Sequence, residues 1–219
     1  MRLLLSGGGD AKDVIPIDEF FISQIDLERT VLYIPVAMEA DAYTYDQCLK
    51  WFTGVYRHLG VKNIEMCVDL NQAQLGEKYS AVFIGGGNTF KLLKEIKASG
   101  FDEKLVDYLN QGGFVYGGSA GSIIFGKDIM CAEYADENKI GLKDTAGLNL
   151  IKGFDLCCHY GTGDESKNIF ERNAIEKYIE QGNDIIALPE HCALFVEGNA
   201  ISFMGSGAAI FKGRLYRDD

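Results

Sequence analysis

Three short apolar stretches, each running directly into a glycine-rich turn, constrain the fold of this 219-residue chain more than any other feature. They are residues 2–6 before Gly7-Gly8-Gly9, residues 80–84 before Gly85-Gly86-Gly87, and residues 113–116 before Gly117-Gly118. Short apolar runs that alternate with helix-like segments predict buried strands of a parallel sheet covered by helices. The working site of such a sheet lies at the carboxyl ends of its strands, where all three turns fall.

The predicted fold class is therefore α/β, with a mostly parallel sheet flanked by helices on both faces and antiparallel strands at the C-terminal end. Further predicted strands are residues 30–35, 63–70 and 184–188. Residues 130–133 and 155–159 are strand candidates. An antiparallel meander is predicted for residues 193–196, 200–203 and 208–216. Helical spacing is found in residues 18–25, 43–59, 89–96, 101–110 and 165–179. In the last of these, Ile169, Ile175 and Ile179 are expected to face inward. No internal repeat or linker interrupts the pattern, so residues 1–219 are expected to form a single domain.

Composition narrows the possible partners and the compartment. A net charge of -11 argues against nucleic acid and anionic membranes as binding partners. Residues 1–6 are too short an apolar run for a signal peptide, and no stretch approaches the length of a membrane span. The six cysteines form no C-x-x-C pair, which favours reduced core residues over disulfides or a zinc site. We therefore expect a cytoplasmic protein with no metal and no cofactor.

The third glycine-rich turn fits the G-x-S-x-G pattern of a nucleophile elbow, as Gly117-Gly118-Ser119-Ala120-Gly121. A sharp turn from a strand into a helix holds its serine in a strained backbone conformation, which only small neighbours tolerate. The following helix would point its free N–H groups at the serine oxygen. The same residues also fit an ordinary βα turn with Ser119 as the helix N-cap, so the pattern alone leaves both interpretations open.

The other two glycine triplets do not fit known phosphate-binding patterns. Lys12 and Phe90 occupy the last glycine position of G-x-G-x-x-G, and no G-K-[ST] sequence occurs. An acyl-transfer site, however, needs two backbone N–H donors that converge on one oxyanion. Ala120, which follows the serine, would supply one, and the loop 85–87 lies on the correct edge to supply the other. A tight turn capped by Asn88 explains the same loop, and both interpretations can hold together.

A serine nucleophile also needs a base and an acid that orients the base. Of the three histidines, His58 lies within a predicted amphipathic helix, His159 ends a strand candidate, and His191 follows a predicted strand. We favour His159, because it ends the apolar run 154–158 at the sheet edge. The chain order serine, acid, histidine of the α/β-hydrolases would require an acid before His159. The candidates for that order are Asp128, Asp136 and Asp144, whereas Glu190 gives the order serine, histidine, acid.

These segments resemble the peptidase E (aspartyl dipeptidase) serine peptidases of family S51. The resemblance rests on Ile84-Gly85-Gly86-Gly87-Asn88-Thr89-Phe90 with Leu92-Leu93, on Gly118-Ser119-Ala120-Gly121, on His159 and on Leu188-Pro189-Glu190. It implies a fold similar to class I glutamine amidotransferases. It further implies Ser119 as nucleophile, His159 as base and Glu190 as orienting acid, with the N–H groups of Gly87 and Ala120 as the oxyanion hole.

The sequence departs from the aspartyl-specific members at one position. Those members have an arginine on the helix after the histidine, which holds the substrate carboxylate. Here that position falls at Glu171 or Asn173, depending on where a gap is placed. Arg172 lies between them and is the candidate substrate-binding residue, but one step along a helix turns a side chain by about 100°. The resemblance therefore implies the fold and the hydrolytic groups of the family more strongly than it implies specificity for aspartyl substrates.

The expected function is that of a serine exopeptidase acting on dipeptides or other short peptides. One alternative is a cyanophycinase-like hydrolase, whose basic substrate would suit the acidic chain. Another is an inert binding module that keeps the amidotransferase-like fold without activity.

Overall fold

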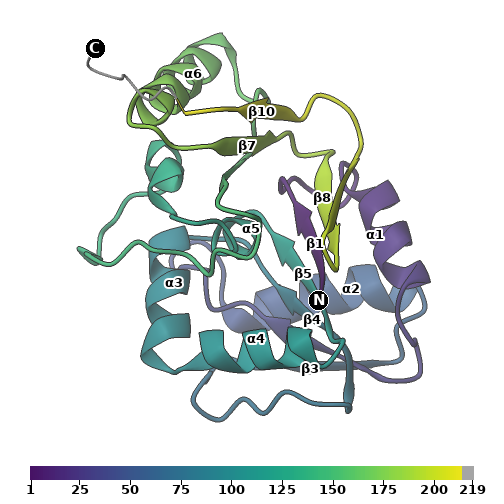
Figure 1. Cartoon of the computed structure of the whole chain (residues 1–219). Helices are drawn as coiled ribbons and strands as arrows, with labels where there is room; N and C mark the ends of the chain where they lie inside the picture. Colours follow the sequence, from purple (N-terminus) through teal and green to yellow (C-terminus); the bar gives the residue numbers. More distant parts are fainter. Residues whose placement is uncertain (214–219) are drawn as a thin grey trace.

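The computed structural model describes residues 1–213 and places them around a seven-stranded sheet (Figure 1). The strand order is β3-β2-β4-β5-β1-β8-β9, and the five strands from β3 to β1 are parallel. The bounds are β1 Arg2–Ser6, β2 Thr30–Ile34, β3 Asn63–Met66, β4 Tyr79–Ile84, β5 Phe114–Gly118, β8 Ala193–Glu197 and β9 Ala200–Met204. Strands β8 and β9 form an antiparallel hairpin that pairs with β1 at Ala193–Glu197. The predicted fold class is confirmed.

Helices cover both faces of this sheet. They are α1 Ile15–Ser23, α2 Tyr45–His58, α3 Thr89–Ala98, α4 Phe101–Asn110 and α5 Ala120–Ile123. The last helix, α6 Glu165–Glu180, lies away from this sheet, next to β7 and β10 (Figure 1). Side chains on β2 alternate between the two faces, as the strand period of two requires. Val31 and Tyr33 pack with the apolar residues of α1 and α2, whereas Leu32 and Ile34 pack with those of α3 and α4. Figure 1 shows α1 and α3 on opposite sides of the strands.

Three helices begin at side-chain caps that the sequence supplies. Thr44 and Gln47 form a capping box at the start of α2. The Asn88 side chain accepts the Lys91 N–H at 3.0 Å, so the residue after the second glycine triplet starts α3. Asp164 caps α6 in the same way. The cap interpretation of Asn88 is therefore confirmed, and it leaves the preceding glycines free for another role.

A second sheet of three strands lies beside the carboxyl ends of the main sheet (Figure 1). Its order is β10-β7-β6, with bounds β6 Asp155–Cys158, β7 Ile185–Leu188 and β10 Ala209–Phe211. The predicted C-terminal meander is therefore wrong in its third strand, because β10 leaves the β8–β9 hairpin and pairs antiparallel with β7. The end of that predicted strand, residues 214–216, lies outside the described residues.

Two further local predictions are wrong. Residues 130–133 lie in a 3-10 helix, Met130–Tyr134, because the Asp128 side chain accepts the Met130 N–H at 2.8 Å and starts a turn. In α6, Ile169 is 45% exposed. The buried stripe of α6 begins at Glu171 and continues through Ile175, Tyr178 and Ile179. Residue 169 stands two positions before that stripe, on the opposite side of the helix.

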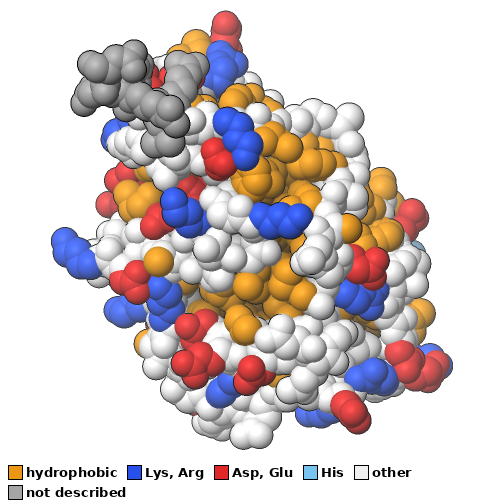
Figure 2. All heavy atoms as spheres, viewed as in Figure 1, with side chains coloured by type: hydrophobic (Ala, Val, Ile, Leu, Met, Phe, Trp, Pro, Cys, Tyr) orange, Lys and Arg blue, Asp and Glu red, His pale blue; other side chains and the backbone are white. Residues whose placement is uncertain are grey.

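The surface of the described residues carries both hydrophobic and charged side chains. No helix within residues 1–213 is long and apolar enough to cross a bilayer. Figure 2 shows hydrophobic side chains gathered over the middle of one face, with acidic and basic side chains interspersed around them. Phe203 on β9 and Ile210 on β10 are among the exposed hydrophobic residues, at 39% and 53%.

Candidate active site

Ser119 occupies the sharp turn between β5 and α5, as the G-x-S-x-G pattern predicts. Its φ of 51° and ψ of -114° lie in a region that non-glycine residues rarely adopt. A Cβ atom on Gly117 would lie 2.3 Å from the Gly121 carbonyl oxygen, and one on Gly121 would lie 2.2 Å from the Ile84 carbonyl oxygen. The two outer glycines of the pattern are therefore required by close backbone contacts, and they let the turn close tightly around Ser119.

Gly121→Ala is expected to lower the free energy of unfolding by about 3 kcal/mol, because the new Cβ must displace backbone rather than a flexible side chain. Gly118→Ala is the matched control, since its Cβ would meet nothing closer than 3.8 Å. The control should change the free energy by less than about 1 kcal/mol. Denaturant unfolding of both variants measures the difference, and equal values for the two would contradict the packing argument.

The side chains of Ser119, His159 and Glu190 form one continuous chain of hydrogen bonds. Ser119 Oγ lies 2.8 Å from His159 Nε2, and His159 Nδ1 lies 2.9 Å from Glu190 Oε1. The side chains of His159 and Glu190 are partly exposed, at 38% and 31%, so a ligand can reach them. Three segments that are far apart in sequence thus meet at the carboxyl ends of β5, β6 and β7.

The first glycine triplet positions the histidine and the glutamate. His159 also has a positive φ, of 59°, and its N–H donates to the Gly7 carbonyl at 2.9 Å. A Cβ on Gly8 would lie 2.4 Å from His159 Cε1, and one on Gly9 would lie 2.9 Å from Glu190 Cβ. Sequence reasoning weighed this triplet only as a phosphate cradle and missed this role. The sequence feature that could have indicated this role is the run of three glycines at the end of the first strand, because glycines allow other segments to approach closely.

The loop after His159 is held by a buried acidic residue on α6. Glu171 is 4% exposed, and its Oε2 accepts the Gly161 N–H at 2.8 Å. Burial raises the pKa of the Glu171 carboxyl. Thr162 Oγ1 donates to the His159 carbonyl at 2.7 Å and closes the same turn. Both backbone polar groups of His159 are therefore hydrogen-bonded, its N–H to the Gly7 carbonyl and its carbonyl to the Thr162 hydroxyl.

The rival histidines and acids are not part of this chain of hydrogen bonds. His58 is exposed on α2, and His191 Nε2 donates to the Ser206 carbonyl at 2.8 Å. None of the three aspartates that fit the α/β-hydrolase order is hydrogen-bonded to His159. Asp128 accepts from Thr145 and Met130, Asp136 accepts from Thr89, and Asp144 pairs with Lys97.

The loop 85–87 and the start of α5 lie around the serine. A Cβ on Gly86 would lie 3.3 Å from Ser119 Cβ, so this loop approaches the serine closely. The hydrogen bonds of the turns and caps within residues 1–213 leave the N–H groups of Gly87 and Ala120 without a partner. Gly87 has a φ of 138°, and a Cβ there would lie 2.4 Å from the Ala37 carbonyl oxygen. Both predicted oxyanion donors therefore have a free N–H, Gly87 in the loop after β4 and Ala120 at the start of α5.

Ser119 and His159 line two cavities. One, of about 490 Å³, extends from Ser119 and His159 to Tyr33, Tyr116 and Asp18. The other, of about 590 Å³, is lined by the 3-10 helix and the residues after it, including Asp136 and Lys139. Arg172 is exposed on α6 and lines neither of them. The structure thus places the candidate substrate-binding arginine on the surface, away from these two cavities.

Asp18 is a buried acidic residue that sequence reasoning did not single out. It is 4% exposed, and its Oδ1 accepts hydrogen bonds from the hydroxyls of Tyr56 at 2.8 Å and Tyr116 at 3.1 Å. Burial raises the pKa of Asp18 to about 6, against the lowering effect of the two tyrosine hydrogen bonds. No periodicity marks it, because an acidic residue in the first turn of a helix is ordinary.

Asp18→Asn is expected to stabilise the chain at neutral pH and to have a smaller effect in acid. The pKa of Asp18 is higher in the folded chain than its ordinary value of 3.8. The carboxyl is therefore neutral in both states below about pH 4, and the folded state carries a disfavoured charge above about pH 6. As the pH rises through this window, the free energy of unfolding of the parent should fall by up to roughly 3 kcal/mol. The variant has no carboxyl at this position and should not lose that stability. Denaturant unfolding at about pH 4 and about pH 7.5 tests this, and a pH-independent difference between the two proteins would contradict it.

Comparisons with known proteins place the chain in a family. A model of peptidase family S51 matches residues 2–204. An uncharacterised peptidase of Listeria monocytogenes serovar 1/2a is 28% identical over 204 residues, which cover 87% of this chain and 92% of that protein. Peptidase E of Salmonella typhimurium is 27% identical over 134 residues, which span 61% of this chain and 56% of peptidase E.

Solved structures show the same architecture. The crystal structure of a candidate peptidase E from Listeria monocytogenes EGD-e has a TM-score of 0.75 and 27% identity, covering 94% of this chain and 98% of that one. A peptidase from an acI-B1 actinobacterium, 15% identical with a TM-score of 0.70, shares the fold over 97% of this chain and 91% of its own. The resemblance drawn from the glycine motifs and the serine elbow is confirmed, and the chain belongs to peptidase family S51 and is a peptidase.

Proposed function

We propose that this peptidase is a serine-type exopeptidase that hydrolyses dipeptides or other short peptides through Ser119, His159 and Glu190. The observation that carries the proposal is the unbroken hydrogen-bond chain from the Ser119 hydroxyl through the His159 ring to the Glu190 carboxylate. Nucleophile, base and orienting acid in this arrangement are the minimum set for acyl transfer by a serine.

In the resting enzyme, Glu190 accepts the His159 Nδ1–H and thereby leaves Nε2 unprotonated towards Ser119. His159 Nε2 takes the hydroxyl proton as Ser119 Oγ attacks the scissile carbonyl carbon. The charge that develops on the carbonyl oxygen is held by the N–H groups of Gly87 and Ala120. His159 then donates the proton to the leaving amine, which departs and leaves an acyl-serine.

Water completes the cycle by the reverse proton movements. His159 removes a proton from the water as it attacks the acyl-serine carbonyl, and returns it to Ser119 Oγ as the acid product leaves. The strained backbone of Ser119 supports this role, because strain is retained at positions where the surrounding structure fixes a reactive group.

The size and charge of the site support a small peptide as substrate. The two cavities lined by Ser119, of about 490 and 590 Å³, have the volume of small-molecule sites. The net charge of -11 supports a peptide rather than nucleic acid or an anionic membrane as partner. Arg172 stands on the exposed face of α6, so the proposal does not include aspartyl specificity.

Labelling with a fluorophosphonate probe, followed by hydrolysis of a dipeptide panel, tests the proposal. The probe should label Ser119 in the parent and nothing in Ser119→Ala, and the parent should release free amino acids from at least one dipeptide. A parent protein that is neither labelled nor active on any dipeptide would favour the inert binding module. Cleavage confined to aspartyl-arginine units joined through the aspartate side chain would favour the cyanophycinase-like alternative.

A further inference from the structure

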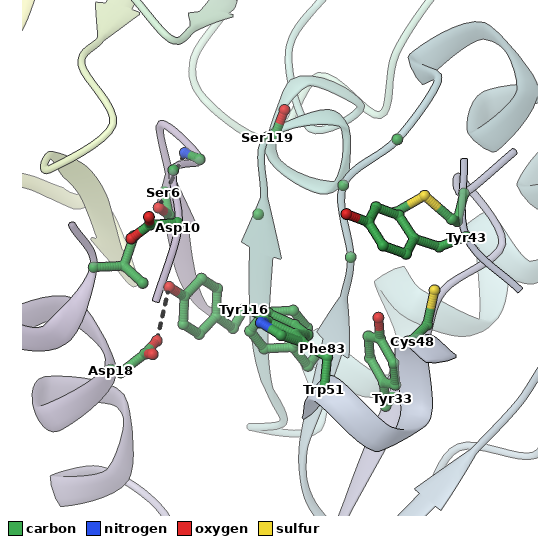
Figure 3. Close-up of a pocket in the computed structure, with 18 of the residues that line it drawn as sticks. Ser6, Asp10, Asp18, Tyr33, Tyr43, Cys48, Trp51, Phe83, Tyr116 and Ser119 are labelled. Atoms are coloured by element: carbon green, nitrogen blue, oxygen red, sulfur yellow. Dashed lines mark hydrogen bonds between the residues drawn. The ribbon is translucent and has the colours of Figure 1, made fainter. Parts of the chain in front are cut away.

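The cavity that begins at Ser119 and His159 ends at a carboxylate with one free oxygen. Asp18 is more than nine-tenths buried, and both of its tyrosine donors, Tyr56 and Tyr116, are bonded to Oδ1. Oδ2 accepts no hydrogen bond within residues 1–213, and Asp18 lines the cavity. Figure 3 shows Asp18 on α1 pointing towards Tyr116, with Tyr33 on the opposite wall and Ser119 at the end of the strand that carries Tyr116.

The lining of this cavity supplies no positive charge to match the carboxylate. Its described residues include no lysine and no arginine, and its acidic residues are Asp10 and Asp18. Its inner wall is aromatic, formed by the buried rings of Tyr33, Phe83 and Tyr116. A buried carboxylate without a cationic partner is unfavourable, so the balancing charge is expected from a ligand.

The depth of the cavity indicates what kind of ligand group reaches Asp18. Tyr116 precedes Ser119 by three residues, and a strand rises by about 3.3 Å per residue, so the floor lies roughly 10 Å from the serine. A group at the scissile bond itself, such as the α-amine of a dipeptide, stops short of that floor. An extended lysine or arginine side chain spans it, with its methylenes against the aromatic wall.

We propose that this cavity is the specificity pocket for a cationic side chain, lysine or arginine, on one of the two residues that flank the scissile bond. The inference rests on the proposed peptidase function and adds the substrate class. Asp18 Oδ2 accepts a charge-assisted hydrogen bond from the cation, while Tyr56 and Tyr116 hold Oδ1 in place. The rings of Tyr33, Phe83 and Tyr116 add cation–π attraction in a site shielded from water.

Charge-matched peptide pairs test this inference. Lysyl-alanine and alanyl-lysine are compared with the same dipeptides carrying norleucine, which keeps the methylenes and removes the ammonium. The parent should prefer lysine to norleucine by about 10- to 100-fold in kcat/KM at one of the two positions, as a charged hydrogen bond allows. Asp18→Asn should reduce that preference at least about tenfold.

Glu19→Gln is the matched control, because Glu19 is the next residue on α1, is exposed, and does not line the cavity. It removes the same unit of charge and should leave the lysine preference intact. An equal loss of preference in Glu19→Gln would assign the effect to net charge and overturn the pocket. Equal turnover of lysine and norleucine peptides by the parent would also overturn it, while leaving the serine mechanism standing.

Binding to Ser119→Ala keeps the inference testable without turnover. Isothermal titration of this variant with each peptide should show tighter binding of the lysine member of at least one pair. Equal affinities in both pairs would overturn the cationic pocket even if no substrate had been hydrolysed. Absence of both probe labelling and hydrolysis in the parent, with a clear lysine preference in binding, would instead overturn only the proposed catalysis.

Discussion

Ser119→Ala should lower kcat/KM for the best dipeptide substrate by roughly 10⁴- to 10⁶-fold and leave the fold unchanged. The loss follows from removal of the only oxygen within hydrogen-bond distance of His159 Nε2 among the described residues. Alanine is smaller than serine and keeps a Cβ in the same place, so the tight turn formed by Gly117 and Gly121 is not disturbed. Steady-state hydrolysis, together with thermal unfolding of parent and variant, measures both parts of the expectation.

Ser122→Ala is the matched control for that loss. Ser122 lies three residues further on, is fully buried, and donates its hydroxyl towards the carbonyls of Ser6 and Gly117. Its hydroxyl has no access to a substrate, so the variant should keep activity within a few-fold even if it unfolds somewhat earlier. Substantial hydrolysis by Ser119→Ala, well above the level of the assay without enzyme, would show that Ser119 is not the nucleophile.

Glu190→Gln should lower kcat by roughly 10²- to 10⁴-fold while the protein stays folded. The carboxylate accepts the His159 Nδ1–H at 2.9 Å, which orients the ring and stabilises it when it takes the serine proton. A glutamine has nearly the same shape but no charge, and it can present an N–H to Nδ1 and favour the wrong tautomer. Comparison of kcat for parent and variant on one dipeptide, with unfolding curves for both, tests the expectation.

His191→Asn provides the control for this second variant. His191 is adjacent in sequence, but its ring donates to the Ser206 carbonyl and does not contact Ser119. Its replacement should change kcat by less than about threefold. If Glu190→Gln retained nearly full activity, Glu190 would not be the orienting acid. Asp136, which lines a cavity together with His159 and whose carboxyl pKa is raised by burial, would then be the next residue to replace.

Local pattern predicted the main sheet because its strands are recognisable one at a time. The runs 2–6, 80–84 and 113–116 are short, apolar and ended by glycine, and each is a parallel strand of the seven-stranded sheet. The serine elbow was equally predictable from the sequence. A Cβ on either outer glycine would lie within 2.3 Å of a backbone carbonyl oxygen, so only glycine fits at both positions. A requirement that belongs to a few consecutive residues appears directly in the sequence.

The wrong predictions concern residues whose environment is set by segments that are distant in the sequence. Apolar character in residue 169 predicted an inward side chain, but the docking of α6 through Glu171 and Tyr178 set a different buried face. Strand β10 follows a hairpin in sequence, and only pairing with β7 places it in the second sheet. Both outcomes depend on which surfaces are available for packing once the main sheet has formed, and no short window of sequence contains that information.

The sequence by itself determined the parallel sheet, the turn that exposes Ser119, and, through motif resemblance, the three residues that line up as Ser119, His159 and Glu190. Only the tertiary structure decided that His159 and Glu190 come from a separate sheet and rest against the first glycine triplet, and that Asp18 closes a cavity beneath Ser119. The reason is that backbone geometry of a turn is a local property, whereas the shape and charge of a cavity are set by side chains that several elements bring together.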